Sequence, residues 1–202
     1  MKLLGVTIQE HLKWNDHVRE VLKATYGTLR ALRQIKRMTP FRLRKNLAES
    51  LILTRIDYAV TLYGNNLQEY LKHRIQKVIN SAAGYVYNRY SKQIDVVNLK
   101  WLPFDERIAF YTVKLAFKAI NDPNWPKYLP VVCKRPLKKL RNQPNEVFSI
   151  APGKNEKSLV NNMSKHYNDL PLNIRKLTDI NRFNTESKTY FIDRALSKSL
   201  TF

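Results

Sequence analysis

The sequence predicts a mainly α-helical protein that begins with one short strand and ends, after a proline-rich arm, in a short helical tail. Three observations predict this fold class. Apolar residues recur every three or four positions over most of residues 16–120, which is the helical period. A strand-like run of Leu, Val and Ile occurs near the start of the chain. Six of the nine prolines lie between residues 123 and 152, where they disfavour regular structure.

The first element is a predicted strand from Lys2 to Ile8, which Gly5 interrupts. The next hundred residues offer no second convincing strand, and a strand requires a partner. We therefore expect this segment to be the cut edge of a sheet.

A first helix is predicted from Asn15 or Asp16 to Met38. Its apolar face is formed by Val18, Val21, Leu22, Leu29 and Leu32. A stripe of five basic residues, about 80° wide and about 27 Å long, runs beside that face at the helical rise. Its members are Arg19, Lys23, Arg30, Arg33 and Arg37. The stripe is either a surface that binds phosphates or an ordinary solvated face, and the residues favour neither over the other.

Three further helices are predicted before residue 123. Thr39-Pro40 starts one that carries Leu43, Leu47, Leu51 and Ile56 and stops near Gly64. Another follows Asn65 or Asn66 and ends between Gly84 and Asn88, with its apolar face formed by Leu67, Leu71, Ile75, Val78, Ile79 and Ala82. The next begins after Pro103 and is closed by Asn121-Asp122-Pro123. Residues 89–99 show no clear pattern.

The remaining chain divides into a linker and a tail. Residues 123–157 form a predicted proline-rich basic linker, which contains Lys134, Arg135, Lys138, Lys139 and Arg141. This basic run is a phosphate-binding arm, a nuclear-import signal or a solubilising linker. A short helix at 158–167, a turn at 169–171 and an amphipathic helix at 180–195 follow. The predicted domains are thus residues 1–122, the linker 123–157 and the tail 158–202.

The composition indicates a folded polycation. Lys and Arg number 36 against 16 Asp and Glu, a formal charge of +20, while 44% of the residues are hydrophobic, as in globular proteins. Such a charge attracts nucleic acid or anionic membranes. The longest uncharged run is 11 residues, shorter than the roughly 17–25 that a membrane helix requires. The single cysteine, Cys133, cannot form an internal disulfide, so we expect an intracellular protein of the nucleus or cytoplasm.

The sequence offers no recognisable catalytic constellation. It has no Asp-Asp pair, and its one pair of adjacent acids, Asp105-Glu106, lies where acids favour a helix N-terminus. Its four histidines form no HExxH motif, and its five glycines form no phosphate-binding loop. We therefore predict no catalytic residue, no metal site and no cofactor, and a chain that is not an enzyme on its own.

Two groups of aromatic residues have alternative interpretations. Tyr85, Tyr87 and Tyr90 fit packing at a helix end better than a platform for stacking bases. The three tryptophans are expected to be core or interface anchors: Trp14, Trp101 and Trp125.

Six short motifs, in order, resemble the carboxy-terminal region of non-LTR (LINE-like, jockey-type) retrotransposon reverse transcriptases. Leu4-Gly5-Val6-Thr7-Ile8 with Leu12-Lys13-Trp14-Asn15-Asp16-His17 is similar to the family's LGV-x-ID-x-x-L-x-W-x-x-H signature. The others are Ile56–Ala59 through Tyr63-Gly64, Leu71–Ile79, Leu99–Arg107, Pro126–Leu129, and Tyr167–Pro171 with Ile174-Arg175, Phe183 and Lys188. Tyr63 and Tyr167 stand where the family usually has Trp.

The resemblance implies a fold and a function. It implies that the helices form a thumb-like bundle that binds the template-primer, which is an RNA or RNA-DNA duplex. It also implies that the first strand is the remaining part of a missing palm. The family's two catalytic aspartates and their Mg²⁺ would lie upstream, so no catalytic role is carried over to this chain. The expected function is that of a non-catalytic fragment of an RNA-directed DNA polymerase, from a truncated element copy. The alternatives are a free-standing or host-adopted basic RNA/DNA-binding helical protein, and a pseudogene product that hardly folds.

Overall fold

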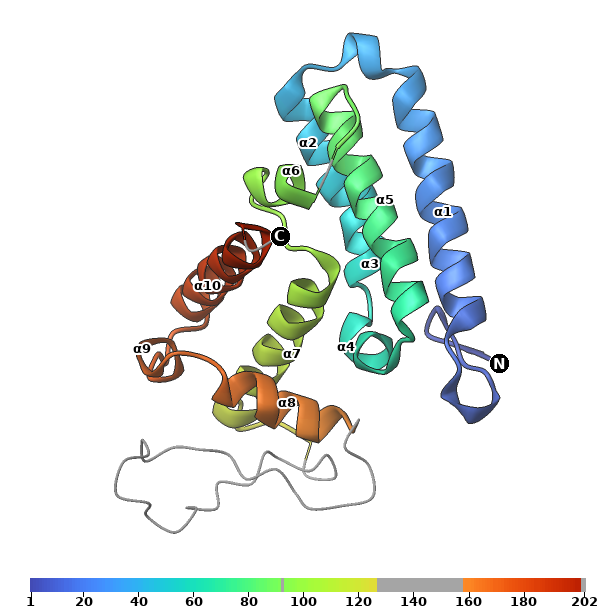
Figure 1. Ribbon diagram of the computed structural model, residues 1–202. Coiled ribbons are helices and arrows are strands. Elements are labelled where there is room, and N and C mark those ends of the chain that lie inside the picture. Colours follow the sequence, from blue (N-terminus) through green and yellow to red (C-terminus); the bar gives the residue numbers. More distant parts are fainter. Residues whose placement is uncertain (92, 127–157, 201–202) are drawn as a thin grey trace. The chain divides into compact units, whose positions relative to one another are not determined.

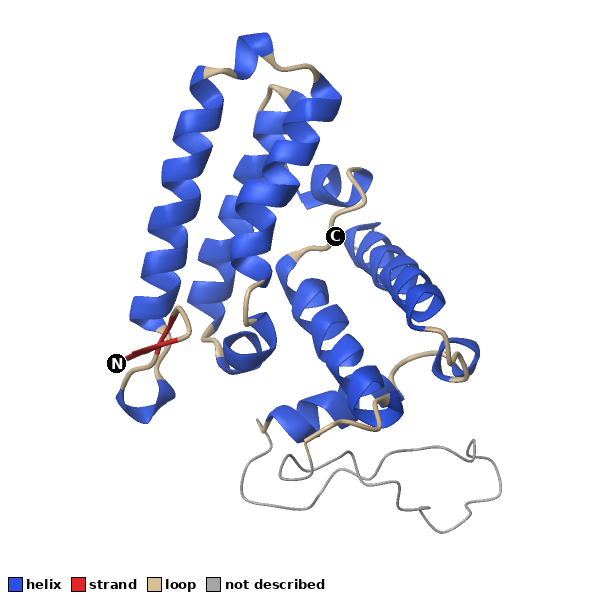
Figure 2. Cartoon of the chain, turned by 180° about the vertical axis from the view of Figure 1, so that it is seen from behind, coloured by secondary structure: helices blue, strands red, loops and turns tan. Residues whose placement is uncertain are grey.

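The computed structural model describes residues 1–91, 93–126 and 158–200, and this part of the chain is mainly helical with a small two-stranded sheet (Figures 1 and 2). Contacts group the chain into two compact units, Met1–Arg107 with Ile192–Phe202, and Ile108–Phe191. The domain boundaries predicted near residues 122 and 157, and the proline-rich arm, depend on residues 127–157. Those residues lie outside the described part, so these expectations stay predictions.

The chain begins with a β-hairpin. Strand β1 (Lys2–Leu3) pairs antiparallel with β2 (Val6–Thr7), with Leu3 opposite Val6. The two residues between them, Leu4 and Gly5, have φ angles of 46° and 80°, as a type I′ turn requires. The prediction of one unpaired strand was therefore wrong, because Gly5 does not interrupt a strand but reverses the chain.

Three long helical segments form a bundle in the first unit. They are α1 (Asn15–Gln34), the segment from α2 (Phe41–Ala48) through α3 (Thr54–Asp57), and α5 (Glu69–Tyr87). Helix α5 packs against both α1 and α2. In Figure 1, α1 and α5 run in the same direction and the α2–α3 segment returns in the opposite one. The carboxy-terminal ends of α1 and α5 therefore lie at the same end of the bundle.

Short elements connect the long helices. The segment between α2 and α3, η3 (Glu49–Leu53), is a π-helix, so the chain stays helical from Phe41 to Asp57. The others are η1 (Glu10–Leu12), η2 (Lys36–Met38), α4 (Val60–Tyr63), η4 (Gly64–Asn66) and α6 (Gln93–Asn98). Helix α6 lies in the segment 89–99, where no clear pattern was visible in the sequence.

The apolar face of α1 agrees with the prediction, whereas its end does not. Four of the five predicted residues, Val18, Leu22, Leu29 and Leu32, are buried, and the fifth, Val21, is half-buried. The helix ends at Gln34 rather than at Met38, so Arg37 lies on η2 and not on α1.

The prediction for the helix beginning after Pro40 was partly wrong. Leu43 and Leu51 are exposed, while Ala48, Ile52 and Ile56 are buried. Two apolar stripes run along this helix, and periodicity alone cannot choose between them. The stripe of Ala48, Ile52 and Ile56 is the buried one. The helix also stops at Asp57, before Ala59 takes a left-handed conformation with φ 54°.

The apolar face predicted for the third helix is confirmed, because the six residues assigned to it are all buried: Leu67, Leu71, Ile75, Val78, Ile79 and Ala82. Leu67 precedes the helix itself, which begins at Glu69.

The second unit contains most of α7 (Phe104–Asn121) together with α8 (Leu159–Asn168), α9 (Leu172–Arg175) and most of α10 (Ile180–Leu200). Its core is aromatic, because Phe183 stacks on Phe117 with ring centroids 4.0 Å apart. Helices α7 and α8 were predicted; α9 was not, and α10 extends beyond the predicted end at residue 195. Within residues 1–91, 93–126 and 158–200, no helix is both long and apolar enough to cross a membrane.

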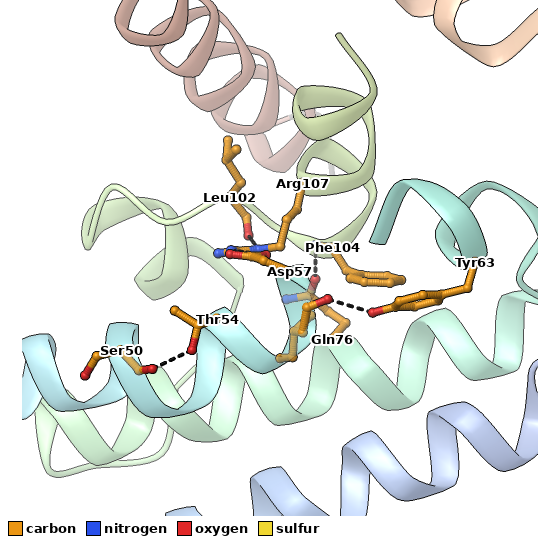
Figure 3. A network of polar contacts seen from close by, with 9 residues as sticks. Ser50, Thr54, Asp57, Tyr63, Gln76, Leu102, Phe104 and Arg107 are labelled. Atoms are coloured by element: carbon orange, nitrogen blue, oxygen red, sulfur yellow. Dashed lines mark hydrogen bonds and ion pairs between the residues drawn. The ribbon is translucent and has the colours of Figure 1, made fainter. Parts of the chain in front are cut away.

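A polar network holds the start of α7 in the first unit (Figure 3). Nη1 of Arg107 donates to both carboxylate oxygens of Asp57, at 2.7 and 2.8 Å. The backbone N–H of Phe104 donates to Oε1 of Gln76 at 2.7 Å, which satisfies an amide at the helix N-terminus.

The phenol of Tyr63 belongs to the same network, and its Oη donates to the carbonyl of Ile56 at 2.6 Å (Figure 3). Burial, with a smaller contribution from the charge of Asp57, raises the pKa of Tyr63 far above its usual value. The phenol therefore remains a hydrogen-bond donor at any physiological pH.

Asp105 and Glu106 lie in the first turn of α7, as predicted, and both also contact cations from other helices. Asp105 is exposed in the first turn of α7, and its carboxylate lies 3.6 Å from Nζ of Lys72. Glu106 is buried and accepts hydrogen bonds from Arg194 and from Lys198, the latter at 2.7 Å. A buried carboxylate held by two cations has a structural role.

Candidate nucleic-acid interface

Four of the five predicted stripe residues lie on one exposed face of α1, and all four are exposed: Arg19, Lys23, Arg30 and Arg33. From Arg19 to Arg33 this face spans about 21 Å at the helical rise. The fifth, Arg37, is also exposed but belongs to η2. We call the four residues on α1 the α1 basic face.

One of these four cations is ion-paired. Arg19 lies 3.2 Å from Asp16, in an exposed pair of the kind that contributes little to stability. Lys23, Arg30 and Arg33 form no ion pair with a carboxylate of the described residues. Glu20, also on α1, pairs with Lys2 of the hairpin at 3.1 Å. That contact lowers the pKa of Glu20 and neutralises its carboxylate with a cation from outside the α1 basic face.

The sequence from residue 21 to residue 48 contains no Asp or Glu. It contains eight basic residues: Lys23, Arg30, Arg33, Lys36, Arg37, Arg42, Arg44 and Lys45. This stretch includes the second half of α1, η2 and all of α2. The positive charge is therefore concentrated at the end of the bundle where α1 turns into α2.

An aromatic ring lies within the α1 basic face. Tyr26 falls about 20° from Arg19 on the helical wheel, inside the arc of the basic residues. Its side chain is 46% exposed. Aromatic rings interleaved with cations are typical of surfaces that bind unpaired nucleotides, since bases stack on the rings.

A cavity of about 590 Å³ adjoins this face, and we call it the α1–α5 cavity. Tyr26, Arg33 and Lys36 line one side. The other side is formed by one face of α5 and the residues that follow it: Lys77, Asn80, Ser81, Gly84, Tyr85, Asn88, Arg89, Tyr90 and Ser91. The described residues that line it include four cations and no carboxylate.

Local geometry at the end of α5 shapes the cavity wall. Asn88 takes the left-handed conformation with φ 61° that often ends a helix, and the N–H of Arg89 donates to the carbonyl of Gly84 at 3.1 Å. A Cβ on Gly84 would lie 2.7 Å from the carbonyl oxygen of Arg89. Glycine at this position therefore permits the close return of the chain that brings Tyr90 and Ser91 to the cavity.

The three tyrosines near this end have different environments. Tyr85 is 2% exposed, and Tyr87 packs against Phe41 with ring centroids 5.7 Å apart. Partial burial raises the pKa of Tyr87 above its usual value. Tyr90 is 87% exposed, so one of the three rings is accessible for stacking.

The other predicted binding residues lie outside the described part of the chain: Lys134, Arg135, Lys138, Lys139 and Arg141. Among the residues that the structure does describe, no group of three or more His, Cys, Asp or Glu side chains is arranged to hold a metal ion.

Sequence reasoning missed three contributors to the cavity, Lys36, Lys77 and Tyr26. The acid-free stretch 21–48 was a signal for Lys36, and the helical wheel already placed Tyr26 among the basic residues. Lys77 had no such signal, because its place depends on how α5 packs against α1.

Comparisons with protein-family models, with curated proteins and with solved structures find no match to this chain.

Proposed function

We propose that this chain binds an RNA or RNA-DNA duplex through the α1 basic face, as the non-catalytic thumb and downstream region of a non-LTR retrotransposon reverse transcriptase. The observation that carries the binding proposal is the set of four exposed cations along one face of α1, in a region where residues 21–48 contain no carboxylate. The order and spacing of the six motifs support the family assignment.

The α1 basic face suits a phosphate backbone better than a specific base sequence. Its residues are exposed Arg and Lys side chains, which neutralise phosphates, and such contacts fix the position of a protein on a duplex without reading its sequence. The face is about 21 Å long, enough to follow several phosphates of one strand. Binding would therefore be tolerant of sequence and sensitive to salt.

The dependence of affinity on salt tests this proposal. The triple variant R19Q/K23Q/R30Q should bind a 16-base-pair RNA-DNA duplex more weakly and with a shallower slope of log affinity against log salt. The slope should fall by up to about 0.9 for each phosphate that the variant no longer neutralises. Fluorescence anisotropy titrations between 50 and 300 mM KCl measure the affinity at each salt concentration and thus this slope.

The control variant K118Q/K165Q/K176Q removes the same charge from exposed positions in the other compact unit, Ile108–Phe191. It should keep the slope of the unmodified chain. An equal decrease of the slope in both variants would mean that net charge, and not the α1 basic face, attracts the duplex.

We also expect no primer extension by this chain with Mg²⁺ and deoxynucleotides. Extension of a primer would contradict the non-catalytic assignment.

A further inference from the structure

The α1–α5 cavity combines size, charge and accessible aromatic rings in a way that the α1 basic face does not. Its volume of about 590 Å³ lies within the range of about 300–1,000 Å³ typical of small-ligand sites. A concave site of this size cannot hold a duplex. It has room for a single nucleotide.

Three cations at the cavity wall form no ion pair with any carboxylate in the described part of the chain: Arg33, Lys36 and Lys77. The fourth, Arg89, is held by Asp95 through a contact of 2.6 Å. The carboxy-terminal ends of α1 and α5 each add a partial negative charge of about half a unit. Three full positive charges exceed that contribution, so the cavity favours an anion.

The same cavity offers surfaces for a planar ring. Tyr90 is 87% exposed and Tyr26 is 46% exposed, and both line it. Tyr85 also lines the cavity, is 2% exposed, and its hydroxyl has no hydrogen-bond partner among the described residues. An unsatisfied buried hydroxyl costs free energy unless a ligand or water completes it.

We propose that the α1–α5 cavity binds one unpaired nucleotide of a nucleic-acid strand, with its phosphate near Arg33, Lys36 and Lys77 and its base against Tyr26 or Tyr90. An acidic peptide would use the cations but leave the tyrosine rings unused, so the nucleotide fits more of the site. This inference rests on the proposed function, since it assigns the single-stranded part of the same ligand to a second site.

The full chain should distinguish a blunt RNA-DNA duplex from the same duplex with a four-nucleotide overhang. We expect the overhang to tighten binding about tenfold, as stacking of one or two bases would. The variant K77Q/Y90A should lose this gain and still bind the blunt duplex normally. Because Lys77 and Tyr90 are exposed, neither substitution removes a core contact.

Matched control variants test whether the gain depends on the ring of Tyr90 and the charge of Lys77, rather than on the tyrosine hydroxyl or on net charge. Y90F keeps the ring and should keep the gain, and K165Q removes an exposed charge elsewhere and should also keep it. The variant R19Q/K23Q/R30Q should weaken both duplexes equally and preserve their ratio. Circular dichroism and melting temperature verify that each variant is folded.

The outcomes separate the two proposals. A blunt duplex that binds as tightly as the overhang duplex would overturn the nucleotide site and leave the proposed function standing. Equal weakening of both duplexes by K77Q/Y90A would also overturn it, because the cavity would then be general basic surface. Displacement of the overhang duplex by a hexaglutamate peptide at lower concentration than by uridine monophosphate would overturn the nucleotide assignment.

A single-stranded octanucleotide covers the remaining case. If neither duplex binds but the octanucleotide does, and K77Q/Y90A weakens it, the cavity proposal holds and the duplex proposal fails. If none of the three nucleic acids binds, both proposals fail.

Discussion

His17 is a buried titratable residue near the start of α1, and it connects the hairpin to the bundle. Its side chain is 3% exposed, and Nδ1 accepts a hydrogen bond from the backbone N–H of Thr7 at 3.4 Å. The ring meets Tyr63 edge-on, with centroids 4.9 Å apart. Burial lowers the pKa of His17 below its usual value, although the charge of Glu20 opposes this effect. The folded state therefore favours the neutral imidazole.

We expect acidification to destabilise the protein through His17. As the pH falls through about 6.5, the unfolded chain takes up a proton on this residue, whereas the folded chain does so only at lower pH, so the free energy of unfolding decreases. Between pH 7.5 and 5.5 the urea midpoint should fall more for the unmodified chain than for H17Q. The exposed His73 provides the control, and a pH dependence in H17Q equal to that in H73Q would contradict the role of His17.

The ion pair between Asp57 and Arg107 joins α3 to α7 and is largely buried, because the two side chains are 16% and 7% exposed. Removing one partner leaves the other charge buried without compensation. We expect D57A to lower the free energy of unfolding by about 3–5 kcal/mol, measured by urea denaturation. Glu186, in a more exposed pair with Arg182 at 3.0 Å, is the comparison, and E186A should cost less than about 1 kcal/mol. Similar decreases in the two variants would mean that burial does not distinguish these pairs.

At the scale of elements, the two helical glycines Gly27 and Gly84 differ in their surroundings. A Cβ on Gly27 would meet no atom within 4 Å, whereas one on Gly84 would lie 2.7 Å from the backbone oxygen of Arg89. The first glycine only weakens α1, because its backbone entropy opposes helix formation. The second allows the end of α5 to form.

Alanine at these two positions should have opposite effects. G27A should raise the free energy of unfolding by about 0.5–1 kcal/mol, the usual gain of Ala over Gly in an exposed helix. G84A should lower it and should also reduce the preference for an overhang duplex, because the turn that brings Tyr90 to the cavity must shift. Thermal melting and anisotropy measure the two effects. Stabilisation by G84A would contradict the close contact with Arg89.

The elements could be predicted from sequence to the extent that their residues interact locally. The period of Val18, Leu22 and Leu29 predicted α1, and Pro103 predicted the start of α7. The type I′ turn at Leu4-Gly5 was missed because a leucine with positive φ is unusual, so the glycine alone was a weak signal. The buried stripe of α2 also depends on tertiary packing, which periodicity does not contain.

The candidate site likewise has one part that could be predicted from local sequence and one part that could not. The α1 basic face is a property of one helix, so the wheel placed Arg19, Lys23 and Arg30 on it correctly. The α1–α5 cavity joins residues far apart in the chain, such as Arg33 and Lys77, and exists only because α5 packs on α1. Local sequence patterns cannot show such a pairing.

For the whole molecule, the described candidate binding residues belong to one of the two compact units. The α1 basic face and the α1–α5 cavity lie in the unit of Met1–Arg107 with Ile192–Phe202, whereas Phe183 lies in the unit of Ile108–Phe191. There it is fully buried and stacks on Phe117. The residues proposed to bind nucleic acid and the residues of this aromatic core are thus separate sets.

This separation predicts that stability and binding respond independently to a core substitution. F183A should lower the free energy of unfolding by about 3–5 kcal/mol, because it leaves a cavity in an aromatic core. At a temperature where the variant stays folded, its affinity for the blunt duplex should remain within twofold of that of the unmodified chain, since no described cation of the α1 basic face is altered. I180A, at a 42% exposed position on the same helix, should change neither quantity. A decrease in affinity above fivefold in folded F183A would show that residues of the second unit take part in binding, and the duplex site would then have to extend beyond α1.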